Sequence, residues 1–81
     1  MKLPRDISGG ELSKSLEKYG YRATRQTGSH IRLTSTIKVT EHHLTIPAHK
    51  ALRVGTLNNI LNEVAAYLEM DRKTLMEELF R

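Results

Sequence analysis

Gly28-Ser29-His30-Ile31-Arg32-Leu33-Thr34 is a glycine turn signal followed by an alternation of polar and apolar residues. A period of two is typical of a β-strand that has one buried and one exposed face. We therefore expect a strand from His30 to about Thr36 whose isoleucine and leucine face a core, with Gly28 in the tight connection before it. The exposed face of this strand is expected to carry His30, Arg32 and Thr34.

Two further strands are expected beside this one. The first runs from Tyr21 to Gln26, with Tyr21 and Ala23 on one face. The other runs from His43 to Ile46 and stops at Pro47, which has no N–H for a strand ladder. The exposed face of the sheet is then predicted to hold Arg22, Thr24, Gln26, His30, Arg32, Thr34, His43 and Thr45.

Helical patterns lie on both sides of the strands. Ser8 and Glu11 have the spacing of a capping box, and Gly20 is a suitable left-handed cap, so a first helix is expected between them. Thr56 is the expected N-cap of a second helix, and Asp71 that of a third. The apolar stripes of these two helices comprise Leu57, Ile60, Leu61, Val64 and Leu68, then Leu75, Met76 and Leu79. The order helix, three strands, two helices predicts an α+β fold in which a three-stranded antiparallel sheet carries its helices on one face.

Length and composition set broad limits on the protein. Eighty-one residues without cysteine predict a single domain over 1–81 that has neither disulfides nor thiolate metal sites. No apolar run reaches the length of a membrane span, and the N-terminal residues lack the apolar stretch of a signal peptide. We therefore expect a cytoplasmic protein with no membrane partner.

The net charge of +4 is unevenly distributed along the chain. From Lys18 to Asn62 there are seven Lys and Arg residues against one acid, Glu41, whereas the preceding residues sum to 0 and the following ones to −2. All four histidines also lie in this central part. Basic charge concentrated over the strands favours a phosphate-bearing partner, and a solvated surface that keeps a small protein soluble is the alternative.

His30 and Arg32 combine two groups suited to a phosphodiester. Imidazole can take or give a proton near neutral pH, and a guanidinium can hold a phosphate in a forked geometry. RNA carries its own nucleophile, the 2′-OH, so its cleavage needs a base, an acid for the leaving 5′-oxygen and positive charge near the phosphorane. His30 can serve as base or as acid, and Arg32 can stabilise the phosphorane. Alternatively, both are ordinary surface residues of the sheet.

Other basic residues are candidates for contacts with backbone phosphates: Arg22, Lys38, Lys50 and Arg53. Three histidines can bind zinc, but the adjacent His42 and His43 point to opposite faces of a strand and cannot both reach His30. We therefore expect no metal site and no cofactor. His43 shares the exposed face of His30 and is a second candidate acid or base, whereas His49 falls in a loop.

The chain resembles the HicA toxins, ribosome-independent RNA-cleaving proteins of bacterial toxin–antitoxin pairs. The resemblance lies in the order and spacing of several short motifs: Ile7-Ser8-Gly9-Gly10-Glu11-Leu12, Gly20-Tyr21, Gly28-Ser29-His30, Leu44-Thr45-Ile46-Pro47-Ala48-His49, Gly55-Thr56-Leu57 and Ile60-Leu61. It implies a fold like the double-stranded-RNA-binding domain (dsRBD), to which Asp71 to Leu79 adds an extra helix. It also implies that His30 is the catalytic residue and that a HicB-like antitoxin neutralises the protein.

Residues and resemblance together predict a metal-independent RNA endonuclease, an mRNA interferase, that uses His30 as general acid or base. A non-catalytic RNA-binding module of the same dsRBD-like fold is the alternative, and a protein-interaction domain that binds an acidic partner is a third reading. His30 separates the first two, because a protein that only binds RNA does not need it.

Overall fold

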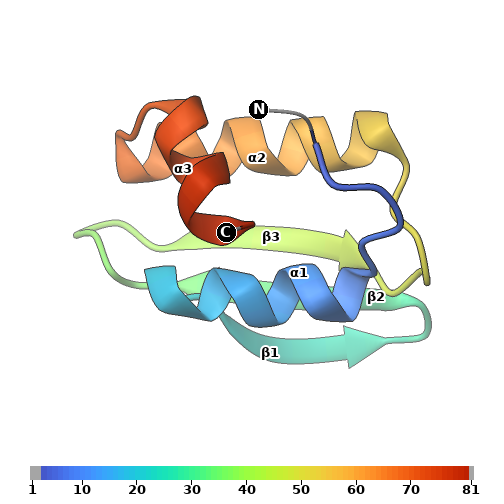
Figure 1. The fold of residues 1–81 in the computed structure, drawn as a ribbon. Helices are drawn as coiled ribbons and strands as arrows, with labels where there is room; N and C mark the ends of the chain where they lie inside the picture. Colours follow the sequence, from blue (N-terminus) through green and yellow to red (C-terminus); the bar gives the residue numbers. More distant parts are fainter. Residues whose placement is uncertain (1–2, 81) are drawn as a thin grey trace.

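The computed structural model describes residues 3–80, and its elements follow the predicted order (Figure 1). A short helix α1 and a 3₁₀ turn η1 precede three strands, which are followed by two helices. Their bounds are α1 Gly9–Ser15, η1 Leu16–Tyr19, β1 Arg22–Thr27, β2 His30–Ser35, β3 His42–Pro47, α2 Val54–Leu68 and α3 Arg72–Leu79. The predicted α+β class with a dsRBD-like arrangement is confirmed.

The three strands form one antiparallel sheet in the order β1-β2-β3. β1 and β2 are joined by the two residues Gly28 and Ser29, and Gly28 has a φ of +55°. The hairpin turns that match the twist of a sheet need a positive φ at their first central residue, which glycine adopts without strain. In β2 the alternation is as predicted, since Ile31 and Leu33 are buried and His30 and Arg32 are exposed.

The hydrophobic core lies between the sheet and the helices. α1 and α2 lie along the sheet and both contact β3, while α3 packs against α2 (Figure 1). The predicted stripes of the last two helices are buried in this core. Its largest fully buried apolar side chains are Tyr21, Leu12, Leu16, Leu33, Ile46, Leu57, Leu61, Leu75 and Val64. The helices therefore occupy one side of the sheet and leave the other side exposed.

Helix α1 starts with the predicted capping box. The Ser8 hydroxyl accepts from the Glu11 N–H at 3.0 Å, and the Glu11 carboxylate accepts from the Ser8 N–H at 2.9 Å. Hydrogen bonding from the Ser8 backbone N–H, and to a smaller extent from the Ser8 hydroxyl, holds the pKa of the Glu11 carboxyl below its ordinary value. Gly9 follows directly, and a Cβ added to it would lie 2.0 Å from the Pro47 carbonyl oxygen. Only glycine therefore lets α1 start this close to the end of β3.

The helix ends differ from the predictions at one point. Gly20 has a φ of +82° and caps η1, as expected, and the Asp71 carboxylate accepts from the Thr74 N–H at the start of α3. The prediction of Thr56 as N-cap of α2 is wrong, because the helix already begins at Val54 after Arg53. The N-cap is Arg53, whose side chain makes no capping hydrogen bond. The prediction looked for a side chain that can cap a helix, and the true N-cap position has none.

A β-bulge in β1 changes which residues face outward. The register shifts between Ala23 and Arg25, so that Arg25 pairs with Arg32 and Gln26 pairs with the core-facing Ile31. The prediction that Gln26 shares the outer face is therefore wrong. A bulge inserts one extra residue and reverses the facing of the residues after it. We call the outward surface the polar face; it comprises Arg22, Thr24, Arg25, Thr27, His30, Arg32, Thr34, His43 and Thr45.

Candidate nucleic-acid interface

The hairpin end of the polar face contains a shallow depression of about 170 Å³. Its lining consists of residues from all three strands: Arg25, Thr27, His30, Arg32 and Thr45. Arg32 pairs with Arg25 on one side and with Thr45 on the other, and His30 pairs with Thr27. Two residues along a strand span about 7 Å. One imidazole and two guanidinium groups thus line the same depression.

His30 is positioned by the ends of all three strands. It opens β2 directly after the Gly28–Ser29 turn and lies between Thr27 of β1 and Pro47 of β3. The Ser29 carbonyl accepts from the Ala48 N–H at 2.6 Å, which ties the turn to the segment after β3. The His30 side chain is exposed on this rigid support, so that a ligand can reach it.

Arg25 and Thr27 enter the site because of the bulge. Thr24 is the extra residue, and its hydroxyl lies 3.2 Å from that of Thr34 and donates to the Arg32 carbonyl at 3.4 Å. In a regular register Arg25 would face the core side. The alternation in β1 did not reveal these two residues, because a bulge depends on the partner strand and carries no local sequence signal here.

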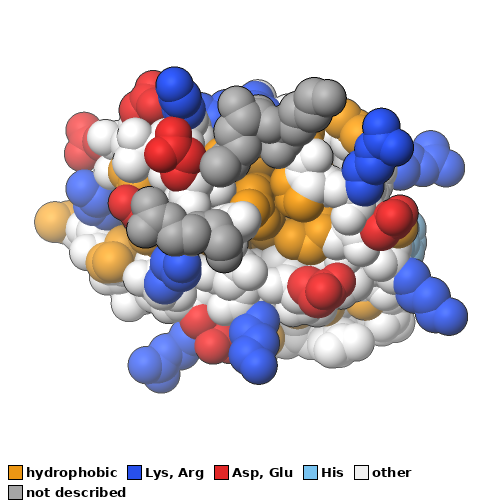
Figure 2. Space-filling model, viewed as in Figure 1, with side chains coloured by type: hydrophobic (Ala, Val, Ile, Leu, Met, Phe, Trp, Pro, Cys, Tyr) orange, Lys and Arg blue, Asp and Glu red, His pale blue; other side chains and the backbone are white. Residues whose placement is uncertain are grey.

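The charges of the sheet and of the helices are separated. The three strands contain Arg22, Arg25 and Arg32 and no acid. The acids lie on the helices or beside them, apart from Glu41 just before β3. Figure 2 shows these acidic side chains mixed with basic ones on the helix-bearing face. The polar face is therefore positively charged, as an interface for a phosphate chain requires.

The other predicted phosphate contacts fall into two groups. Lys50 and Arg53 are exposed in the segment between β3 and α2, at the His30 end of the sheet. Arg22 pairs with Thr34 near the opposite end. Lys38 lies beyond that end, in the loop after β2, where its Nζ is 3.5 Å from a Glu69 carboxylate oxygen. The structure therefore brings only Arg32 of the predicted set into the depression with His30.

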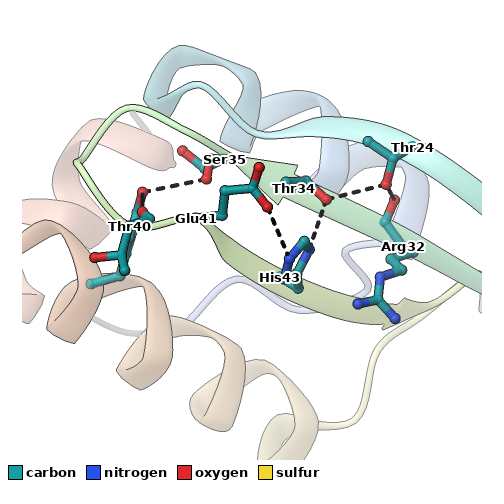
Figure 3. Close-up of polar contacts among 8 residues, drawn as sticks. Thr24, Arg32, Thr34, Ser35, Thr40, Glu41 and His43 are labelled. Carbon is teal, nitrogen blue, oxygen red and sulfur yellow. Dashed lines mark hydrogen bonds and ion pairs between the residues drawn. The ribbon is translucent and has the colours of Figure 1, made fainter.

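The second histidine of the polar face, His43, belongs to a different cluster (Figure 3). Its Nδ1 lies 2.9 Å from the Thr34 hydroxyl, and its Nε2 lies 3.4 Å from a Glu41 carboxylate oxygen. Because it pairs with Thr34, it is four residues along the sheet from His30, on the order of 13 Å. His43 is thus too far from His30 for both to act on one phosphate.

The remaining histidines also lie away from the depression. His42 points to the opposite face, where its Nδ1 is 2.7 Å from the Tyr21 hydroxyl and its ring stacks on Tyr67 with centroids 4.8 Å apart. Burial, with smaller effects of Tyr67 and Glu63, raises the pKa of the Tyr21 hydroxyl, so Tyr21 stays neutral.

His49 is exposed, and its carbonyl accepts from the Gly9 N–H at 3.0 Å. Within residues 3–80, no three His, Asp or Glu side chains gather in a way that could hold a metal ion.

The comparisons with known proteins agree with the motifs and the fold. A family model described as the HicA toxin of bacterial toxin–antitoxin matches residues 9–65, which include every strand and most of α2. A comparison with curated proteins gives no match, and one with solved structures gives none either. Among residues 3–80, no helix has the length and apolarity needed to cross a membrane. Because the family model covers well over half of the chain, the protein belongs to the HicA toxin family, the toxins of bacterial toxin–antitoxin pairs.

Proposed function

We propose that this toxin is an RNA endonuclease, an mRNA interferase, in which His30 transfers a proton during cleavage. The observation that carries the proposal is the position of the imidazole, exposed beside Arg32 in the depression at the hairpin end of the polar face. Membership of the HicA family supports RNA as the substrate. A proton-transfer group needs a fixed support and an open approach for its substrate, and His30 has both.

The chemistry needs no nucleophile from the protein. The 2′-oxygen of a ribose forms a bond to the adjacent phosphorus, and the bond from phosphorus to the 5′-oxygen breaks. The 2′-OH gives its proton to a base, and the leaving oxygen receives one from an acid. We assign one of these two transfers to His30, and we assign to Arg32 the stabilisation of negative charge on the phosphorane.

The RNA strand is held by the basic residues around the depression. Lys50 and Arg53 lie at the His30 end and Arg22 along the sheet, so they can follow the phosphates on both sides of the cut. Lys38 is the most remote, and its ion pair with Glu69 must open before it can contact RNA. Contacts of this kind supply affinity without selecting a sequence.

A HicB-like antitoxin is the proposed protein partner. Silencing a nuclease whose site lies on an open sheet requires the site to be covered. The polar face is positively charged and unobstructed by the helices, and an acidic surface that lies over it would shield His30. Opposite charge on the two surfaces would speed their association.

The proposal is tested by the products of the reaction. The purified chain is incubated with an RNA oligonucleotide in EDTA, and the ends are identified by mass spectrometry, with an oligonucleotide that carries 2′-hydrogen throughout as the control substrate. We expect 2′,3′-cyclic phosphate and 5′-hydroxyl ends from RNA and no cleavage of the control. RNA that is bound but uncut would favour the non-catalytic module, and activity that needs a divalent ion would contradict the mechanism.

A further inference from the structure

We propose that Arg25 and Arg32 form a two-arginine clamp for the scissile phosphate, and that the β-bulge at Thr24 exists to build it. This inference rests on the proposed function and adds a residue that the motifs did not indicate. Arg25 and Arg32 face each other on neighbouring strands and line the same depression as His30. The ligand is a phosphodiester, and inorganic phosphate is its simplest probe.

The facing arginines are unfavourable for the empty sheet. Residues directly opposite on antiparallel strands have Cβ atoms about 5 Å apart, and like charges at such positions repel each other. No strand residue supplies a carboxylate to compensate, and the Arg32 partner on β3 is the uncharged Thr45. An anion between the two guanidinium groups turns this repulsion into attraction, which is a physical reason to expect one.

The bulge is specifically what creates the facing pair. Without the bulge, a regular register that pairs Arg22 with Thr34 would place Thr24 opposite Arg32 and Arg25 opposite the core-facing Ile31. In the structure the Thr24 hydroxyl donates a hydrogen bond to the Arg32 carbonyl and also forms one with the Thr34 hydroxyl (Figure 3). These two hydrogen bonds stabilise the irregular backbone of the bulge. Bulges near active sites commonly serve to re-aim a side chain.

The dimensions suit a tetrahedral phosphate. A guanidinium can present two N–H groups to two oxygens at once. With Arg25 and Arg32 each holding the non-bridging oxygens, the phosphorus lies over the Arg25–Arg32 pair, and His30 is about 7 Å further along β2 at its Cα. An imidazole on that Cα reaches back toward a bridging oxygen. Thr27 and Thr45 border the site and leave it open above.

The clamp is tested separately from cleavage. Binding of inorganic phosphate, and of an RNA oligonucleotide whose 2′-hydroxyls are methylated and cannot react, is measured by calorimetry for the wild type, Arg25→Ala and Arg25→Lys. Lys14→Ala is the matched control, because it removes the same charge from the exposed surface of α1, outside the polar face. Cleavage of ordinary RNA is then measured on the same four proteins.

We expect both Arg25 variants to bind the methylated RNA about tenfold more weakly than Lys14→Ala, the size of one lost charge-assisted hydrogen bond, and to lose the saturable binding of phosphate. Cleavage should fall on the order of 10²-fold. Arg25→Ala should melt no lower than the wild type, since it removes a like-charge contact. Equal RNA and phosphate binding by Arg25→Ala and Lys14→Ala would overturn the clamp, even if His30 proves to be catalytic.

Discussion

Replacing Gly9 with alanine tests how the sheet and α1 fix the position of the site. A Cβ at Gly9 would lie 2.0 Å from the Pro47 carbonyl oxygen, 2.9 Å from its carbonyl carbon and 3.1 Å from the Ala48 Cα. All three atoms are backbone, so no side chain can turn away to make room. To lengthen the distance between the new Cβ and the Pro47 carbonyl oxygen to 3.0 Å, α1 or the end of β3 must move by about 1 Å.

The cost of this change follows from the geometry. Forcing an extra carbon into a closely packed contact costs about 1–3 kcal/mol, against which a helix gains up to about 1 kcal/mol when glycine is replaced by alanine. Because 1 kcal/mol shifts the melting temperature of a domain this small by about 4–8 °C, Gly9→Ala should melt several degrees below the wild type. Pro47 pairs with His30, so cleavage should fall as well.

Gly10 is the matched control for this experiment. An added Cβ there meets only the Ser8 hydroxyl oxygen, at 3.9 Å, so Gly10→Ala should be neutral or more stable than the wild type. Thermal unfolding followed by circular dichroism, with urea midpoints as a second measure, compares the two variants. If Gly9→Ala were as stable as Gly10→Ala, the backbone of α1 could not lie as close to the end of β3 as described above.

Two further predictions concern the partner and the response to pH. A cognate antitoxin should protect His30 from modification by diethyl pyrocarbonate and should associate more slowly as salt rises; an inhibited complex in which His30 is modified as fast as in the free toxin would contradict masking of the site. Burial, reinforced by the hydrogen bond and the charge of Glu78, raises the pKa of Tyr19 to about 12. The unfolded chain loses the phenolic proton of Tyr19 near pH 10, whereas the folded chain keeps it. Tyr19 therefore stabilises the fold fully below pH 10, and this contribution is lost as pH rises toward 12. Urea midpoints should therefore fall less between pH 9 and 11 in Tyr19→Phe than in the wild type, and identical slopes would show that Tyr19 does not cause the loss.

Local signals in the sequence predicted most of the fold. The capping box at Ser8, the alternation after Gly28 and the cap at Asp71 each depend on residues within one turn or one strand, and each is present in the structure. The start of α2 was misplaced by three residues, because the N-cap is Arg53 and the predicted cap, Thr56, lies inside the helix.

The candidate site was predicted only in part. His30 and Arg32 share the exposed face of β2 because their spacing alone places them there. Arg25 was missed, since its outward position depends on a bulge that forms between two strands. The separation of His43 from His30 likewise follows from the register of β3 against β2, which alternation within one strand cannot predict.

The rate of RNA cleavage by His30→Ala shows whether His30 transfers a proton in the reaction, with His43→Ala as a control from the same face. His30 is exposed and its loss opens no core cavity, so stability should change by less than about 0.5 kcal/mol, and RNA binding should persist through the arginines. Cleavage should fall by about 10²–10⁴-fold in His30→Ala and stay near the wild-type rate in His43→Ala. Cleavage at the wild-type rate by folded His30→Ala would show that His30 transfers no proton in the reaction.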